Sequence, residues 1–263
     1  MGEMLTVKDL RVTFLDNNKE ALHGISFSMQ EGERLGLVGE SGSGKTVTAM
    51  AITGLIERSR VTVTGDVVFE GIDLHRCSRS KLRSIQGPGM GVVFQEPMNS
   101  LNPLIKVGDQ VEEVLRIHTK KTPEERRKLA IDALDRVGLP NPEEIYSKYP
   151  HQLSGGQRQR AMIASAMIIH PKLLICDEPT TALDVSVQAK ILKLLRELSD
   201  EYKVGILLIS HDLMVVKQLC ENVAVMYKGN IVEQGKTLDI FNAPKDEYTR
   251  QLMAAIPKRK RHE

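Results

Sequence analysis

The stretch that most constrains this chain is 39–46, which reads Gly39-Glu40-Ser41-Gly42-Ser43-Gly44-Lys45-Thr46. It has the form G-x-x-x-x-G-K-[ST] of a phosphate-binding loop. The apolar run 34–38 predicts a buried strand before the loop, and 48–55 predicts a helix after it. In that setting backbone N–H groups converge on phosphate oxygens, and the helix N-terminus adds partial positive charge. We therefore expect Lys45 to contact the β- and γ-phosphates of a nucleotide and Thr46 to bind Mg²⁺, the alternative being an accidental Gly/Ser loop.

Composition limits the other classes of function. The 263 residues suit one large domain or a domain with a subdomain, and 36 basic against 34 acidic residues predict no polyanionic partner. The absence of Trp argues against stacking on single-stranded nucleic acid. Three cysteines far apart in the sequence favour a reducing cytosol over a disulfide framework. The longest apolar run, 161–169, is too short for a membrane span, and no signal segment is present. We expect a soluble chain whose membrane role needs partner subunits.

Residues 4–38 contain short apolar runs separated by turns at 16–18 and 31–33. This pattern predicts an antiparallel layer that leads into the strand before the phosphate loop. Phe14 precedes the first of these polar turns. It is a candidate for stacking on an adenine ring, and equally a core residue of its strand.

Residues 61–94 predict another strand pair, at 67–69 and 90–94, with a short helix over 80–85 between the two strands. Gln95 follows the second strand and opens a Pro-bounded loop. It suits ligand contact or motion, while an ordinary strand-to-helix connection is the simpler interpretation. Helical spacing then predicts a helical insert over 108–149, in which Thr122 and Pro123 begin a helix.

Residues 153–157 read Leu-Ser-Gly-Gly-Gln and open a further helix. Two glycines at a helix start make a second cradle of backbone N–H groups. A plain helix cap needs no such pair. The second cradle serves either a second nucleotide or the same type of site on a neighbouring chain.

The apolar run 173–176 predicts a buried parallel strand that ends in two carboxylates, Asp177 and Glu178. Such a strand end beside a phosphate loop is where Mg²⁺ is held, so Asp177 is the metal candidate. Glu178 is the candidate base for a water molecule, unless it is a solvated strand-end charge. His211 follows the buried strand 204–209 and is a candidate phosphate donor. The basic tail 258–262 is a solvated end or a contact with anionic lipid.

The loop 39–46, Gln95, the element 153–157, the acidic strand end 173–178, the turn 181–184 and His211 occur in that order. This order resembles the nucleotide-binding subunits of ABC transporters, over about residues 4 to 257. The resemblance implies an α/β fold: a P-loop NTPase (ABC ATPase) core of RecA-like type with an antiparallel β layer, 1–107 and 150–257. It also implies a helical signature subdomain, about 108–170, and a basic tail, 258–263.

The resemblance assigns roles by position. The signature Ser154, Gly155, Gly156 and Gln157 matches the element that grips the γ-phosphate of ATP bound to the opposite subunit, and Asp184 matches an aspartate at the dimer seam. Gln95 matches the residue that senses Mg²⁺ and links to the membrane subunits, and His211 the switch histidine. The implied sites are catalytic Glu178, His211, Gln95 and Lys45; nucleotide-binding Phe14, Gly39, Glu40, Ser41, Gly42, Ser43, Gly44, Lys45, Thr46, Thr48, Ser154, Gly155, Gly156, Gln157 and Asp184; and, for Mg²⁺, Thr46, Gln95 and Asp177.

The implied partners are a second ATP-binding subunit, as a homodimer or heterodimer, and two transmembrane permease subunits, with a solute-binding protein acting indirectly. No nucleic acid is implied, and the expected place is the cytoplasmic face of the cell membrane. The segments 95–103 and 246–257 resemble the peptide/nickel importer subfamily, but no cysteine-rich iron–sulfur extension follows Cys220. We expect uptake of di- or oligopeptides, with nickel or a nickel–metallophore as the alternative. A soluble non-transport ABC ATPase and an unrelated phosphate-loop kinase are the alternatives from other classes.

Overall fold

The computed structural model describes residues 2–57, 59–95, 100–181 and 183–255. Three parts of the sequence lie outside these ranges: the basic tail, residues 96–99 of the segment 95–103, and residue 182 of the turn 181–184. Two compact units are present: Met1–Cys77 with Leu207–Glu263, and Ser78–Ile206. The chain returns to the first unit within strand β8, Gly205–Ser210. The subdomain boundaries expected from the sequence stay a prediction.

The first unit contains an antiparallel sheet in the order β2-β1-β4-β5. Burial alternates along parts of both strands, as expected for strands with one face on a core. The buried residues two apart are Leu5 and Val7, Leu10 and Val12, and Ile25, Phe27 and Met29. The predicted antiparallel layer is confirmed. The bounds are β1 Glu3–Phe14, β2 Lys19–Gln30, β4 Val61–Phe69 and β5 Ile72–Asp73.

The expected strand pair 67–69 with 90–94 is wrong. Val67 of β4 lies opposite Val7 of β1 in antiparallel register. Residues Met90–Val93 form β6, which belongs to the second unit and pairs in parallel with β7, Leu173–Asp177. Both runs form strands as expected, but β4 pairs with β1, 47 to 64 residues earlier in the sequence, and β6 pairs with β7, 83 residues later.

A second sheet in the first unit has the order β10-β9-β3-β8 and carries the phosphate loop at the end of β3. Strands β3 and β9 are parallel, with Leu37 opposite Ala224. Gly36 lets helix α10 pack closely, because a Cβ there would lie 2.3 Å from Cγ1 of Val216. The bounds are β3 Arg34–Val38, α1 Lys45–Thr53, α10 Leu213–Leu219, β9 Asn222–Tyr227, β10 Asn230–Lys236, α11 Thr237–Asn242 and α12 Glu247–Ala254. Helices α11 and α12 were not expected from the residue pattern.

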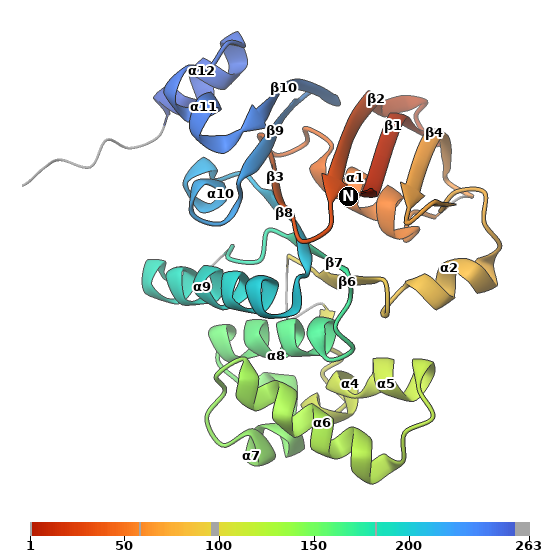
Figure 1. The fold of residues 1–263 in the computed structure, drawn as a ribbon, viewed down its shortest axis with the longest axis vertical. Helices are drawn as coiled ribbons and strands as arrows, with labels where there is room; N and C mark the ends of the chain where they lie inside the picture. Colours follow the sequence, from red (N-terminus) through yellow and green to blue (C-terminus); the bar gives the residue numbers. More distant parts are fainter. Residues whose placement is uncertain (1, 58, 96–99, 182, 256–263) are drawn as a thin grey trace, which may run out of the picture. The chain divides into compact units, whose positions relative to one another are not determined.

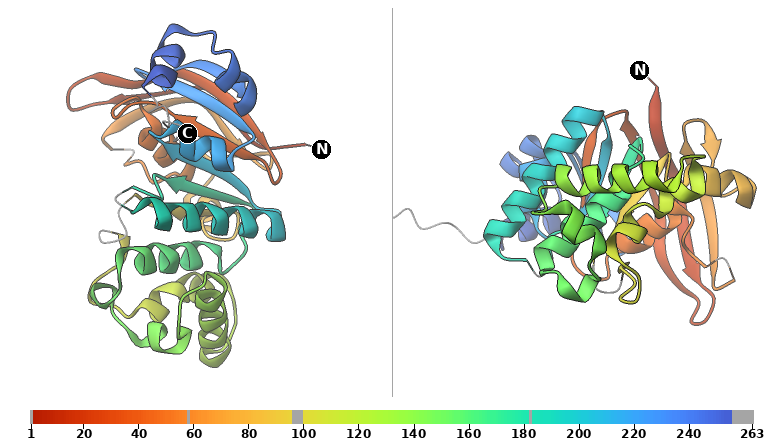
Figure 2. Two further views of the ribbon diagram at one scale, coloured as in Figure 1. Left: turned by 90° about the vertical axis from the view of Figure 1, so that its left-hand side faces the viewer. Right: turned by 90° about the horizontal axis from the view of Figure 1, so that it is seen from below.

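The second unit is mostly helical, as predicted for 108–149 (Figure 1). Helix α6 starts with a complete capping box: Thr122 Oγ1 accepts from Glu125 N, and Glu125 Oε2 accepts from Thr122 N. The two further views in Figure 2 show that α6, α7 and α8 stay together as one bundle. The helices are α2 Arg79–Ile85, α4 Val107–Val111, α5 Glu113–His118, α6 Pro123–Arg136, α7 Pro142–Ser147, α8 Gly155–Met167, α9 Val185–Tyr202 and a 3-10 turn, Pro150–Gln152.

Strand β7, Leu173–Asp177, is buried along its whole length, as its apolar run predicted. It pairs in parallel with β6, Cys176 lying opposite Val93. Burial, together with the neighbouring Asp177, raises the pKa of the Cys176 thiol, so this cysteine stays neutral. In the part of the chain that the structure describes, no helix is long and apolar enough to cross a membrane.

Candidate functional site

The phosphate loop has the predicted strand–turn–helix context. Strand β3 ends at Val38 and helix α1 begins at Lys45. Gly42 and Gly44 between them have φ of 80° and 106°, in the left-handed region. A Cβ at Gly44 would lie 2.7 Å from Cδ2 of Leu22. The loop therefore needs glycine at this position for its backbone conformation and for its approach to β2.

Lys45 lies over the inner side of this loop. Its side chain is 95% buried, since only 5% of the residue is exposed. Its Nζ donates to the carbonyl oxygen of Gly39 at 2.8 Å and to that of Glu40 at 2.9 Å. Two carbonyl oxygens of the loop thus fix the position of the ammonium group at the loop. Thr46, the next residue of α1, is exposed.

Of the other candidates in the first unit, Phe14 and His211 lie at the ends of strands, and Thr48 lies within helix α1. Phe14 is the half-buried last residue of β1, opposite Lys19 of β2. His211 is exposed and directly follows β8. Thr48 is fully buried, and its Oγ1 donates to the carbonyl oxygen of Gly44 at 3.0 Å. The Thr48 hydroxyl therefore stabilises the junction of loop and helix, and its predicted contact with nucleotide stays a prediction.

The acidic candidates belong to the second unit. Asp177 ends β7 and is 6% exposed. Glu178 follows with φ of 46°, a left-handed conformation that is uncommon for a residue with a side chain and is often found at functional sites. Its Oε2 accepts from Nε2 of Gln95 at 2.9 Å and from Oγ1 of Thr181 at 2.8 Å. The structure thus brings two of the predicted catalytic residues, Gln95 and Glu178, into contact.

The predicted second cradle begins helix α8. Ser154 Oγ accepts from Gln157 N at 3.3 Å, and Gln157 Oε1 accepts from Ser154 N at 2.9 Å. This capping box explains Ser154 and Gln157 as a helix start. It does not explain Gly155, whose φ is not positive. Among the described residues, a Cβ at Gly155 would approach Cδ2 of Leu183, at 3.8 Å. Asp184 is the exposed N-cap residue of α9.

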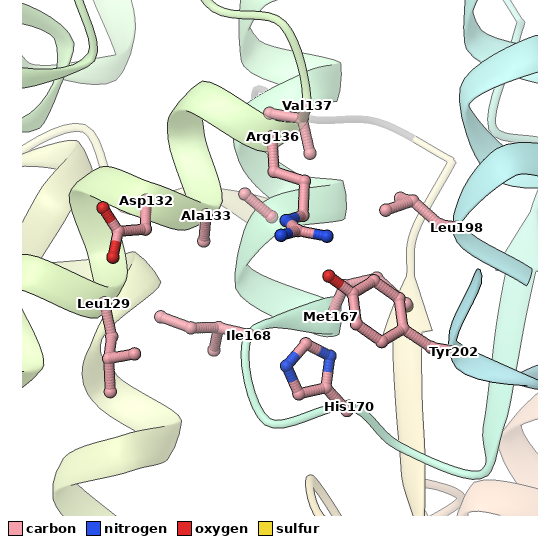
Figure 3. Close-up of a pocket in the computed structure, with 11 residues that line it drawn as sticks. Leu129, Asp132, Ala133, Arg136, Val137, Met167, Ile168, His170, Leu198 and Tyr202 are labelled. Atoms are coloured by element: carbon pink, nitrogen blue, oxygen red, sulfur yellow. The ribbon is translucent and has the colours of Figure 1, made fainter.

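A cavity of about 190 Å³ lies among α6, α8 and α9 of the second unit. Figure 3 shows the Tyr202 ring between the Arg136 guanidinium and the His170 imidazole. The Tyr202 ring lies 4.2 Å from the His170 ring and 5.3 Å from the guanidinium carbon. Partial burial, and then the charge of Arg136, lower the pKa of His170. The cavity contains none of the predicted site residues.

Two contacts at the candidate site have only weak signals in the sequence. Thr181 lies three residues after Glu178, and the turn at 178–181 lets its hydroxyl reach the carboxylate. Tyr248 accepts a hydrogen bond from the backbone N–H of Glu40 in the phosphate loop at 3.0 Å. The two partners are separated by 208 positions in the sequence, so no local pattern predicts the contact.

A glycine-dependent loop between a buried strand and a helix, with a lysine folded over it, defines the class of phosphate-loop nucleotide-binding proteins. The profile of the ABC transporter family matches residues 22–181, more than half of the chain. The chain belongs to the ABC transporter family of ATP-binding domains.

Two curated relatives agree with this assignment. The glutathione import ATP-binding protein GsiA of Escherichia coli O6:H1 is 45% identical over 264 residues, which cover 97% of this chain and 42% of GsiA. The oligopeptide transport ATP-binding protein OppD of Bacillus subtilis is 46% identical over 257 residues, covering 97% of this chain and 72% of OppD. The chain thus spans about two fifths of the length of GsiA.

Two solved structures have the same fold. The dimeric ATP-binding cassette MJ0796, in a post-hydrolysis state with ADP and Pi, gives a TM-score of 0.80 at 30% identity and covers 89% of this chain and 99% of its own. The structure of cbiO1 from Clostridium perfringens, part of the transporter complex cbiONQ, gives 0.78 at 31% identity, covering 98% and 97%. They confirm the expected fold class, an ABC ATPase core with an antiparallel sheet and a parallel sheet.

Proposed function

We propose that this chain is the ATP-binding and ATP-hydrolysing subunit of an ABC importer for peptides. The observation that carries the proposal is the phosphate loop, in which Gly44 has a conformation suited to glycine and Lys45 is already fixed over the loop. Membership of the ABC transporter family supports ATP as the nucleotide. The loop would hold the phosphates of ATP through its N–H groups, and Lys45 would offset charge on the β- and γ-phosphates.

Glu178 would orient the attacking water and take its proton. Its carboxylate is held by Gln95 and Thr181 at one oxygen, so the group has a defined direction before substrate binds. Positioning and electrostatic stabilisation are the main catalytic contributions to phosphoryl transfer. His211 would donate to the γ-phosphate, and Phe14 would stack on the adenine ring.

The oxygen-bearing side chains that the sequence assigns to Mg²⁺ suit that ion. Thr46 supplies an exposed hydroxyl, Asp177 a carboxylate and Gln95 an amide oxygen. A hard cation such as Mg²⁺ prefers oxygen ligands of this kind. When bound, the ion would neutralise phosphate charge, while the loop and Glu178 do the binding and orienting.

A second ATP-binding chain would complete the site by placing its own 153–157 element against the γ-phosphate. The support is the glycine at position 155, which the fold of this chain does not require. One of the similar structures is described as dimeric with ADP and Pi bound. Two permease subunits and, indirectly, a solute-binding protein would complete the importer at the cytoplasmic face of the membrane. The pair of ATPases is either a homodimer or a heterodimer.

Peptides are the proposed cargo because the relatives carry the names glutathione import and oligopeptide transport. Glutathione is itself a tripeptide. The alternative cargo, nickel or a nickel–metallophore, has no support from these relatives. A soluble non-transport ABC ATPase would instead copurify with ribosomes or DNA rather than with membranes.

The test measures ATP binding and phosphate release by the purified chain in the absence of a phosphate acceptor. An ATPase releases phosphate under these conditions, whereas a phosphate-loop kinase needs an acceptor. Lys45→Ala removes the ammonium group that would contact the β- and γ-phosphates. Losing two charge-assisted hydrogen bonds to these phosphates, of about 1.5 kcal/mol each, predicts roughly 100-fold weaker ATP binding. Lys128→Ala, on the exposed face of α6, is the matched control and leaves affinity unchanged. Equal ATP affinity of the parent and Lys45→Ala would refute the proposal.

A further inference from the structure

The C-terminal helix of the first unit reaches the phosphate loop through one side chain. Tyr248, near the start of α12, is 8% exposed. Its hydroxyl oxygen accepts a hydrogen bond of 3.0 Å from the backbone N–H of Glu40. Burial raises the pKa of Tyr248, so the hydroxyl stays protonated at neutral pH and accepts through a lone pair.

The same peptide group makes a second contact on its other side. The peptide bond between Gly39 and Glu40 carries the N–H that donates to Tyr248 and the carbonyl that accepts from Nζ of Lys45 at 2.8 Å. A peptide group is planar, so fixing its N–H also fixes the direction of its carbonyl. Rotation of this plane would break both hydrogen bonds together.

We propose that Tyr248 is a positioning residue of the phosphate loop, which locks the Gly39–Glu40 peptide plane and thereby holds Lys45 ready for a nucleotide phosphate. The inference rests on the proposed function, since it concerns the affinity for ATP. It gives the C-terminal segment after β10 a part in nucleotide binding.

Tyr248 is itself held on two sides. Its ring stacks on Tyr227, at the end of β9, with ring centres 4.1 Å apart. Asp246 caps the start of α12, its Oδ1 accepting from the N–H groups of Tyr248 at 2.9 Å and Thr249 at 3.3 Å. The hydroxyl is therefore fixed by a stacked ring and a capped helix, and its position costs little entropy when the loop closes on a ligand.

The segment that leads into α12 is tied to β10. The carboxylate of Glu233 accepts from Lys245 N at 2.9 Å and from Asp246 N at 3.1 Å. Burial alone would raise the pKa of Glu233, but the hydrogen bonds from this segment hold it below its ordinary value. The carboxylate therefore stays ionised and keeps the start of α12 at the sheet.

Tyr248→Phe removes only the hydroxyl and keeps the stacked ring. The loss of one neutral hydrogen bond at a partly buried donor predicts about five-fold weaker ATP binding. Turnover at saturating ATP stays within two-fold, because Glu178 and its partners are untouched. Tyr227→Phe is the matched control: it removes a hydroxyl from the other ring of the same stack and leaves ATP affinity unchanged.

The experiment measures ATP affinity of the full chain by calorimetry and amide exchange of Glu40 by NMR, in the parent and both variants. We expect Tyr248→Phe alone to weaken ATP binding and to speed exchange at Glu40. Unchanged affinity and unchanged exchange in Tyr248→Phe would overturn the inference. A lower melting temperature of Tyr248→Phe, with an ATP affinity equal to that of the parent, would show a purely structural role for the hydroxyl. That result would also overturn the inference. A parent chain that does not bind ATP would refute the proposed function itself.

Discussion

Substituting Gly155 by alanine separates the requirements of the fold from those of ATP hydrolysis, because we expect the two to respond in opposite directions. Gly155 is the first residue of α8, and its φ is not positive. Among the residues that the structure describes, a Cβ there would approach Cδ2 of Leu183, at 3.8 Å. That is an ordinary van der Waals distance. Gly155→Ala is therefore compatible with the fold of this chain, and any harm must come from a ligand or partner that approaches the helix start.

The expected effect on stability is small and favourable. Replacing glycine by alanine in a helix stabilises it by about 0.5–1 kcal/mol in interior positions, so about 1 kcal/mol is the upper limit at a first turn. For a chain of this size that corresponds to a rise in melting temperature of at most about 4 °C. Scanning calorimetry of the parent and the variant measures this difference.

The expected effect on turnover is large and unfavourable. A methyl group forced into a closely packed contact costs about 1–3 kcal/mol, which lowers the rate of ATP hydrolysis by about 5- to 150-fold. Gly235→Ala is the matched control, because its Cβ would also lie 3.8 Å from its nearest neighbour, Cδ1 of Ile240, and its φ is not positive. That variant should keep the parent rate.

Two results would refute this reasoning. A melting temperature that falls by several degrees in Gly155→Ala would mean that the glycine is needed by the fold. A hydrolysis rate equal to that of the parent, under conditions in which the parent turns over ATP, would mean that nothing approaches Gly155 closely.

The helical unit and the loop each allow further tests. Gly108→Ala would place a Cβ 2.1 Å from Cδ2 of Tyr146, and overpacking of this kind should destabilise the unit by about 1–3 kcal/mol in urea titrations. Thr122→Ala breaks the capping box with Glu125 and should cost about 1 kcal/mol, measured in the same titration. Thr46→Ala should raise the Mg²⁺ concentration for half-maximal turnover by on the order of ten-fold, while the melting temperature stays unchanged.

The parts of the fold that the sequence predicted are those fixed by local chemistry. The phosphate loop needs glycines between an apolar strand and a helix, and that requirement is visible within residues 34–55. The starts of α6 and α8 were also predicted from local residues, Thr122 with Pro123 at the first and the glycines after Ser154 at the second. The structure adds a capping box at each start, formed by Thr122 with Glu125 and by Ser154 with Gln157.

The features that could not be predicted depend on contacts between distant segments. Short apolar runs identified β4 and β6 as strands, but nothing local shows that β4 pairs with β1 and β6 with β7. Helix α12 carries a start signal at Asp246, whereas the contact of Tyr248 with Glu40 exists only once β9 and β10 bring the segment back. Burial of the Thr48 hydroxyl against Gly44 is likewise invisible in the motif.

The central proposal is that Glu178 is the base that activates water for the hydrolysis of ATP. The most direct measurement is the rate of phosphate release by Glu178→Gln beside its affinity for ATP in the same preparation. Loss of a general base predicts a rate at least about 100-fold lower, with ATP affinity within two-fold of the parent and ATP retained in a closed dimer. Hydrolysis by Glu178→Gln at the parent rate would contradict the account.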